Sequence, residues 1–295
     1  MPRNLLIYSL FAAVFLTAGG CRKSEPLKPV LPQNAVIVYM AADNNLEDFA
    51  KDNINQMEQA MTGDDKNLLV YLNATGEAPR VLKIVHDTSP EIVSKAVITY
   101  PAQNSASSAV MTKVLEDIRE AWPAASYGLI LWSHATSWMP PGSRPTTLSF
   151  GDDGGDQMDI KDLKNALPGE YEYIIFDACS MASVEVVYEL RNKTDFILAS
   201  PTETIASGMP YHRVLPHFFE GSAGLQHVAD KYVEYYEQQD GLYRSATMSL
   251  IDTRELPALA AVSKGIIENA EFTHPDYHRE SVQRLDFDSQ PATEG

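Results

Sequence analysis

The sequence has few basic residues, little cysteine and no long apolar run. Its 295 residues hold 23 Lys and Arg against 40 Asp and Glu, which gives a formal net charge of -17. Nucleic acids and anionic lipids are bound by clustered cations, so this charge argues against both as partners. Acidic surfaces also serve solubility alone, so the sign of the charge does not identify a ligand.

Several catalytic motifs are also missing. The chain has no Gly-rich phosphate loop with its Lys and no Gly-x-Ser-x-Gly elbow, although GSAG at 221–224 resembles part of one. Its His and Cys residues show none of the short spacings typical of zinc sites. These absences argue against a P-loop enzyme and a serine hydrolase, and we expect no metal centre.

The N-terminus is typical of an export signal. Residues 1–20 combine a positive charge, an apolar run too short to span a bilayer comfortably, and small residues before Cys21. They resemble a bacterial lipoprotein signal, although Ala18 replaces the usual Leu. We therefore expect lipidation at Cys21, a Pro-rich tether over residues 21–34, and an exported lipoprotein of the cell envelope that contacts the membrane only through its lipid.

The rest of the chain predicts an α/β domain over residues 35–270. Segments 35–42, 67–73, 81–86, 127–132, 171–176 and 196–199 are apolar along most of their length, and helical patterns at 44–61 and 108–122 lie between them. Such strands predict a mostly parallel sheet covered by helices on both faces, which binds its ligands at the carboxyl ends of the strands. A strand at 245–253 and a helix at 255–270 follow. Residues 271–295 show no clear closing element and form a C-terminal extension.

Two predicted strands end in reactive side chains. His134 follows the strand 127–132, and Cys179 follows the strand 171–176. If the strands are parallel, the two side chains emerge at the same edge of the sheet. An imidazole beside a thiol favours the thiolate, and a helix beginning near Met181 would add its N-terminal dipole. With Cys21 lipidated, Cys179 has no disulfide partner, so the alternative is a buried small hydrophobic residue.

These two segments carry a family resemblance. LILWSHATSW at 129–138 and FDACSMASVEVVYEL at 176–190 resemble the clostripain family of cysteine peptidases. VYMAADNNLE at 38–47, FGDDGGDQMDIKDLKNAL at 150–167 and ILASPTETIASGMPY at 197–211 resemble it too. The resemblance implies a caspase-like α/β/α sandwich with a mostly parallel central sheet, acting on peptide or protein substrates.

The resemblance also implies roles for individual residues. Cys179 is the nucleophile and His134 the base, and the backbone N–H groups of Cys179 and Ala135 form the oxyanion hole. The family usually has Gly where this chain has Ala135, so a positive φ there would cost about 1 kcal/mol or more. We expect a monomer.

Specificity for Arg or Lys is a further implication of the resemblance. Asp177 matches the acid that meets the basic side chain of the substrate, and Glu203 is the candidate for a second acid. Alternatively, Asp177 caps the helix that follows it.

The resemblance leaves cofactor and activity open. No cofactor is expected to be required. Calcium is an option at GDDGGDQMD (151–159), but the EF-hand spacing is absent, which favours a tight turn followed by a helix cap. A slow or inactive relative that binds peptides is the alternative to a peptidase, and its motivation is Ala135 together with the unusual segment 200–208. A purely structural lipoprotein would leave the placement of His134 and Cys179 unexplained.

Overall fold

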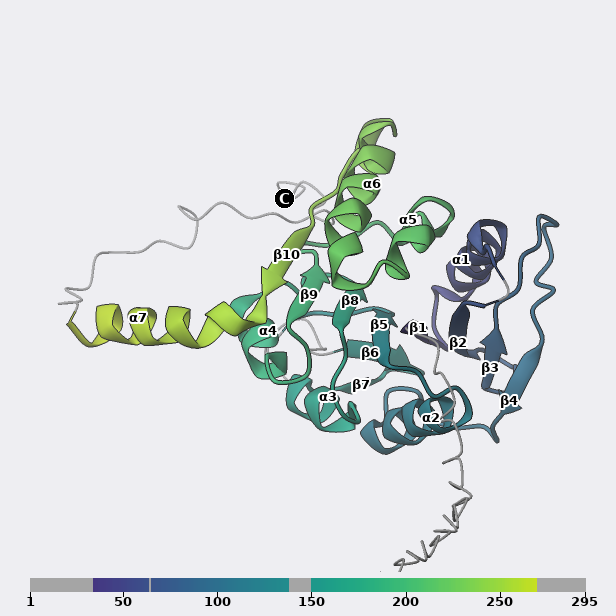
Figure 1. Ribbon diagram of the computed structural model, residues 1–295, viewed down its shortest axis with the longest axis horizontal. Coiled ribbons are helices and arrows are strands. Elements are labelled where there is room, and N and C mark those ends of the chain that lie inside the picture. Colours follow the sequence, from purple (N-terminus) through teal and green to yellow (C-terminus); the bar gives the residue numbers. More distant parts are fainter. Residues whose placement is uncertain (1–33, 64, 138–149, 270–295) are drawn as a thin grey trace, which may run out of the picture. The chain divides into compact units, whose positions relative to one another are not determined.

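The computed structural model describes residues 34–63, 65–137 and 150–269 (Figure 1). The predicted signal peptide, Cys21, most of the tether and the C-terminal extension lie outside these residues. Among the described residues, no helix is both long and apolar enough to cross a membrane.

One large sheet organises the described part of the chain. Its strand order is β10-β9-β8-β5-β1-β2-β3-β4. The neighbouring pairs among β9, β8, β5, β1 and β2 are parallel, whereas β3, β4 and β10 add antiparallel edges. The strands of this sheet are β1 (Asn34–Ala42), β2 (Asn67–Ala74), β3 (Arg80–Lys83), β4 (Ala96–Thr99), β5 (Ser126–Trp132), β8 (Tyr173–Asp177), β9 (Phe196–Ala199) and β10 (Ser249–Asp252). A separate hairpin consists of β6 (Phe150–Asp153) and β7 (Asp156–Met158).

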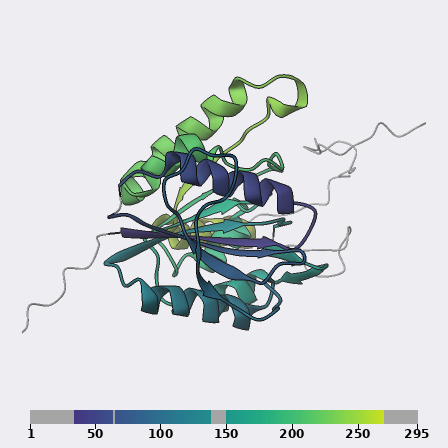
Figure 2. The ribbon, with the colours of Figure 1, turned by 90° about the vertical axis from the view of Figure 1, so that its right-hand side faces the viewer.

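Helices cover both faces of the sheet (Figures 1 and 2). One face packs against α1 (Glu47–Ala60), α5 (Tyr211–Phe218) and α6 (Leu225–Glu237), and the other against α2 (Ser108–Ala121), α3 (Ile160–Ala166) and α4 (Val184–Leu190). The remaining helices are α7 (Leu256–Asn269) and the short 3-10 segments η1 (Gly221–Gly224), η2 (Gly241–Tyr243) and η3 (Thr253–Glu255).

The sheet has a hydrophobic core on each face, which explains why its central strands are apolar along their whole length. Along β1, Ile37 and Tyr39 enter the core with α2, whereas Val38 and Met40 enter the core with α1 and α5. Because successive side chains of a strand point to opposite faces, a strand buried on both faces needs apolar residues at every position. The predicted α/β fold with a mostly parallel sheet is therefore confirmed.

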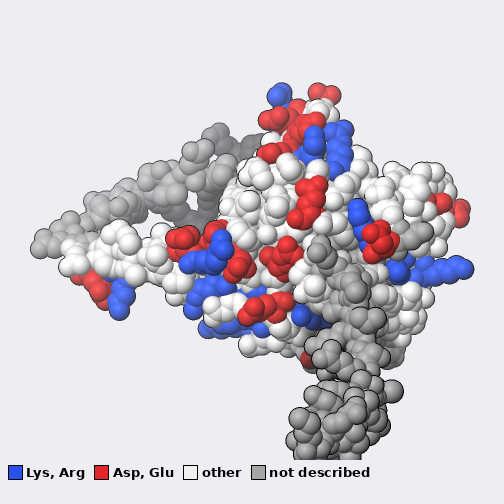
Figure 3. Space-filling view, in the orientation of Figure 1, with Lys and Arg blue, Asp and Glu red and all other residues white. Residues whose placement is uncertain are grey.

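Charge is mixed on the surface, while α7 stays largely apolar. On the face in Figure 3, Lys and Arg lie interleaved with Asp and Glu. In α7, Leu256 is buried but Leu259, Val262, Ile266 and Ile267 are each at least half exposed.

Sequence patterns missed two local features. Strand β4 went unpredicted because its side chains are mostly exposed and it carries no buried pattern. The helix expected from Met181 begins only at Val184, because residues 178–182 form a tight turn in which Met181 is buried as an anchor in the core.

Gly128 provides a test of the packing between neighbouring central strands. It pairs with Tyr173 across β5 and β8, and a Cβ added there would lie 2.1 Å from the Tyr173 ring. That ring is fixed because the Tyr173 hydroxyl donates to the Phe218 carbonyl at 2.8 Å. We expect Gly128→Ala to lower the free energy of unfolding by about 1–3 kcal/mol or more in urea denaturation. As the control, Gly265→Ala places its methyl group in open space within α7 and should be neutral or slightly stabilising. Equal effects of the two substitutions would contradict this packing.

Candidate active site

The strand register brings the two reactive side chains to one edge of the sheet. Trp132 at the end of β5 pairs with Asp177 at the end of β8, and His134 and Cys179 each follow two residues later. Both side chains, together with Asp177, line a single pocket. The expectation that parallel strands would place them side by side therefore agrees with the geometry.

Cys179 lies in a tight turn between β8 and α4. The next residue, Ser180, has a φ of 60°, which is uncommon for a residue other than Gly and is a conformation associated with functional turns. The Ser180 N–H donates to the Thr202 carbonyl at 2.9 Å, which holds the turn against the loop after β9. Because α4 begins only at Val184, the dipole support expected for Cys179 is weaker than the sequence indicated.

Thr204 contacts the sulfur directly. Its backbone N–H points at Cys179 Sγ at 3.3 Å, and its hydroxyl lies 3.5 Å from the same atom. An N–H directed at sulfur stabilises negative charge that develops there. The loop after β9 therefore assists the thiol in a way that the separate sequence motifs did not reveal.

His134 is oriented by Asn45, which lies between β1 and α1. Its Nε2 is 2.6 Å from Asn45 Oδ1. Because a carbonyl oxygen only accepts hydrogen bonds, Nε2 carries the proton and the lone pair is on Nδ1. Burial lowers the pKa of His134 below 6.5, although the nearby Asp152 opposes that shift. The imidazole is therefore mostly unprotonated at neutral pH, as a general base must be.

Asp177 is a buried carboxylate in the wall of the pocket. Its Oδ2 accepts hydrogen bonds from the Met209 N–H at 3.0 Å and the Tyr211 hydroxyl at 2.9 Å. Among the described residues, no donor is directed at Oδ1. Burial raises the pKa of Asp177 to about 6, while the two donors oppose the rise. The alternative that Asp177 caps the following helix is wrong, because the N-cap of α4 is Ser183.

The other predicted site residues are placed differently. Ala135 is buried and forms an isolated bridge with Phe150. It is not among the positive-φ residues, and the left-handed conformation of this loop falls at Ser137 instead, with a φ of 73°. The strain considered for Ala135 is therefore absent. Glu203 is exposed and does not line the pocket that contains Asp177.

The acidic segment 151–159 forms the β6–β7 hairpin and the cap of α3. Gly154 and Gly155 take positive φ at its turn, and Asp159 accepts the Lys161 N–H at 2.8 Å. Asp152 accepts the Gly155 N–H at 3.0 Å, and Asp153 accepts from the side chains of Asn73 and Ser105, both at 2.7 Å. A turn contact therefore accounts for the carboxylate of Asp152 and a cap contact for that of Asp159, whereas Asp153 bonds to residues outside the segment.

Sequence reasoning missed Asn45 and Thr204. Both lie in loops that follow parallel strands, β1 and β9, at the sheet edge that carries His134 and Cys179. The rule that ligands bind at the carboxyl ends of such strands was the available signal, because it directs attention to polar residues just beyond each strand. It could not select these two among the polar residues nearby.

Comparisons with a family model and with solved structures point to the same protein family. The model of the clostripain family matches residues 38–287. The structure of a secreted C11 cysteine protease from Bacteroides thetaiotaomicron, in complex with an irreversible peptide inhibitor, is 35% identical to this chain. That match covers 80% of this chain and 70% of the other, with a TM-score of 0.71.

Two further structures are similar. An inactive zymogen C11 protease from Parabacteroides distasonis is 29% identical, and the match covers 85% of this chain and 75% of that chain with a TM-score of 0.69. A second secreted C11 cysteine protease from Bacteroides thetaiotaomicron, iotapain, is 24% identical, covers 81% and 71%, and has a TM-score of 0.70, which supports the fold alone. A comparison with curated proteins returns no match. With the family model matching most of its length, the chain belongs to the clostripain family and is a cysteine peptidase that acts on peptides or proteins.

Proposed function

We propose that this peptidase cleaves after Arg or Lys through a dyad of Cys179 and His134. The observation that carries the proposal is the buried Asp177 carboxylate, which lines the same pocket as the thiol and the imidazole. A basic side chain entering this pocket would meet an anion and place its own peptide bond near the sulfur.

The reaction follows from the two side chains. His134 Nδ1 takes the thiol proton as the sulfur attacks the carbonyl carbon, which forms a C–S bond and an oxyanion. The N–H groups of Cys179 and Ala135 are proposed to bind that oxyanion. His134 then gives the proton to the leaving amine as the C–N bond breaks. Water activated by His134 hydrolyses the resulting thioester and restores the thiol.

Asp177 suits a cationic partner in both charge and position. Its Oδ2 is held by Met209 and Tyr211, which leaves Oδ1 for a donor on the substrate. Arg presents two N–H groups to a carboxylate and Lys presents one ammonium, and a buried pair with either is strong because water is excluded. Glu203 is exposed outside this pocket, so we assign the primary recognition of the basic side chain to Asp177.

Asn45 acts as a positioning residue in this scheme. By accepting a hydrogen bond from the Nε2–H of His134, it fixes the ring and directs the basic Nδ1 away from Asn45. The same hydrogen bond stabilises the imidazolium that forms during the attack.

The place of action belongs to the same proposal. The signal-like N-terminus supports export, with Cys21 as the lipid-bearing residue and residues 21–34 as the tether. The related C11 protease from Bacteroides thetaiotaomicron is a secreted protein, which is consistent with export of this one. We propose a monomeric enzyme held at the cell envelope by its lipid.

Hydrolysis of fluorogenic peptides ending in Arg, Lys, Asp or Leu tests the specificity. We expect cleavage after Arg or Lys, and none by Cys179→Ala. Asp177→Asn keeps an acceptor for Met209 and Tyr211 but removes the charge, so kcat/KM for basic substrates should fall about 10²-fold or more. Its activity on the Leu peptide should change little.

The outcomes separate the parts of the proposal. Activity on Leu or Asp peptides alone would retain the dyad but contradict the role of Asp177. No cleavage by a folded wild-type chain, together with no labelling of Cys179 by a thiol reagent, would favour the peptide-binding alternative.

The ionisation of Asp177 should appear in the pH dependence. Because its pKa is raised to about 6, the carboxyl is neutral below that pH and charged above it. The ratio of kcat/KM for an Arg peptide to that for a Leu peptide should therefore rise between about pH 5 and pH 7 and then level off. Titration of His134 affects both substrates and cancels in the ratio. A ratio that is constant across this range would contradict recognition by Asp177.

Substitution of Asn45 tests the orientation of His134. Asn45→Ala should lower kcat by up to about 10²-fold, because the imidazole loses the hydrogen bond that orients it. Asn45→Asp keeps the acceptor and should recover much of the rate. Its negative charge should also raise the pKa of His134 and move the acid limb of the pH profile of kcat/KM to higher pH. If Asn45→Asp is as slow as Asn45→Ala and leaves the profile unmoved, Asn45 has only a structural role.

A further inference from the structure

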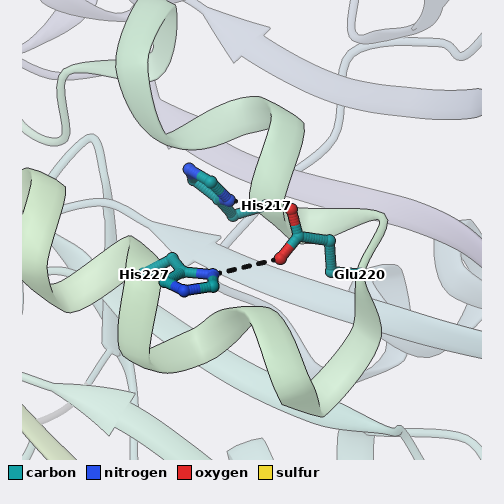
Figure 4. Close-up of side chains that lie close together, drawn as sticks. All are labelled: His217, Glu220 and His227. Atoms are coloured by element: carbon teal, nitrogen blue, oxygen red, sulfur yellow. Dashed lines mark hydrogen bonds and ion pairs between the residues drawn. The ribbon is translucent and has the colours of Figure 1, made fainter.

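A second cluster of chemically reactive side chains lies where α5 turns into α6. His217 on α5, Glu220 in the connection and His227 on α6 face one another (Figure 4). His217 Nδ1 is 2.9 Å from Glu220 Oε1, and His227 Nδ1 is 3.2 Å from Glu220 Oε2. The two imidazole rings are 5.1 Å apart between centroids. The peptidase mechanism uses none of these residues.

The connection between the helices holds this cluster in a defined geometry. A Cβ at Gly224 would lie 2.1 Å from the His217 carbonyl oxygen, so only Gly lets η1 approach the end of α5 this closely. Gly221 has a φ of 65°, and a Cβ there would lie 2.0 Å from a carboxylate oxygen of Glu172. That carboxylate also accepts the Ser222 N–H at 3.1 Å. Three ligand-bearing residues are therefore placed by packed backbone rather than by a long loop.

We propose that His217, Glu220 and His227 form a binding site for Zn²⁺ or a similar borderline transition-metal ion. Two imidazoles and one carboxylate match zinc, which takes nitrogen at about 2.0–2.1 Å and carboxylate oxygen at about 2.0–2.2 Å. Neighbouring ligands on a tetrahedral ion are then roughly 3.3 Å apart. The observed nitrogen–oxygen separations are close to that value, and one ligand atom from each residue lies within 4.8 Å of the others. Small side-chain rotations would bring all three ligand atoms to bonding distance of one ion, and a water would take the fourth coordination position.

The sequence analysis predicted no metal centre, because the spacing of these three ligands is not one of the short zinc motifs. His217, Glu220 and His227 are spaced at i, i+3 and i+10, and only the reversal between α5 and α6 brings the last one back. The side chains of Glu220 and His227 are 45% and 60% exposed, so an ion can enter from solvent.

None of the three residues lines the pocket that holds Cys179. His217 is six residues after Tyr211, roughly 9 Å along the helix axis. Tyr211 on α5 donates to Asp177, and the Tyr236 hydroxyl on α6 donates to the Gly208 carbonyl at 2.6 Å. A metal that joins α5 to α6 therefore stabilises the two helices that hold the loop around Asp177. This inference does not depend on the proposed cleavage after Arg or Lys.

Titration of chelator-treated full-length protein with zinc tests the site. Thiolates also bind zinc, so the parent protein carries Cys21→Ala and Cys179→Ala to remove both competing thiols. We expect one zinc ion per chain by calorimetry and a higher midpoint of thermal unfolding when zinc is in excess, as mass action requires. His217→Ala, His227→Ala and Glu220→Gln, each added to the parent, should lower the affinity at least tenfold and abolish the shift in midpoint.

His212→Ala is the matched control. His212 lies on the same helix, but its Nδ1 contacts Gln56 and it is outside the cluster. This variant should bind zinc like the parent, and excess Mg²⁺ or Ca²⁺ should not displace the ion, because both prefer oxygen ligands. Parent-like binding in the His227→Ala and Glu220→Gln variants, or displacement by Mg²⁺, would overturn the proposal. Because Glu220 and His227 are largely exposed, circular dichroism should show both variants folded.

Discussion

The buried carboxylate of Asp177 is the constraint on which the pocket depends. An anion removed from water is costly unless donors compensate it, and here the compensation comes from Met209 and Tyr211, more than thirty residues further along the chain. The segment that leads to Met209 and Tyr211 must pass close to the carboxylate. A Cβ at Gly208 would lie 2.8 Å from Asp177 Oδ2, so the approach requires Gly at this positive-φ position. The loop after β9 is therefore folded around one side chain at the end of β8.

The same loop also shapes the turn that holds Cys179. Thr202 and Ser200 accept the backbone N–H groups of Ser180 and Ala182, while Thr204 directs its own N–H at the sulfur. The turn with Cys179 and the wall with Asp177 therefore share one support. A substitution that loosened this loop would alter the sulfur environment and the binding wall together, so defects in kcat and KM from this segment would be coupled.

The fold and the central pair could be predicted because both depend on short-range patterns. Apolar strands buried on both faces identify a parallel sheet, and the carboxyl ends of neighbouring parallel strands meet at one edge. That logic places His134 beside Cys179 once β5 and β8 are adjacent, and the Trp132–Asp177 register confirms the adjacency. The predicted start of α4 was wrong, because the spacing of apolar residues does not distinguish the first turn of a helix from a tight turn that buries Met181.

Long-range partners could not be predicted from the sequence. Asn45 reaches His134 across 89 positions of the chain, and Tyr211 reaches Asp177 across 34. Such pairs depend on how loops close over the sheet, which no local pattern encodes. The assignment of Glu203 as a second acid rested on the family resemblance, and Glu203 is exposed and is not among the residues that line the pocket. The positions of donors and acids around a motif are thus less predictable than the motif itself.

The environment of Asp177 also suggests how the proposed specificity would arise. Burial disfavours the charged carboxylate, which is why the pKa of Asp177 is raised to about 6. A bound Arg or Lys would reverse that effect, because an adjacent cation favours the ionised acid, and by linkage the ionised acid favours the cation. An apolar side chain offers no such relief and would bury the carboxylate further from water. Discrimination would then come mainly from the charge pair between the carboxylate and the basic side chain, which an apolar side chain cannot form.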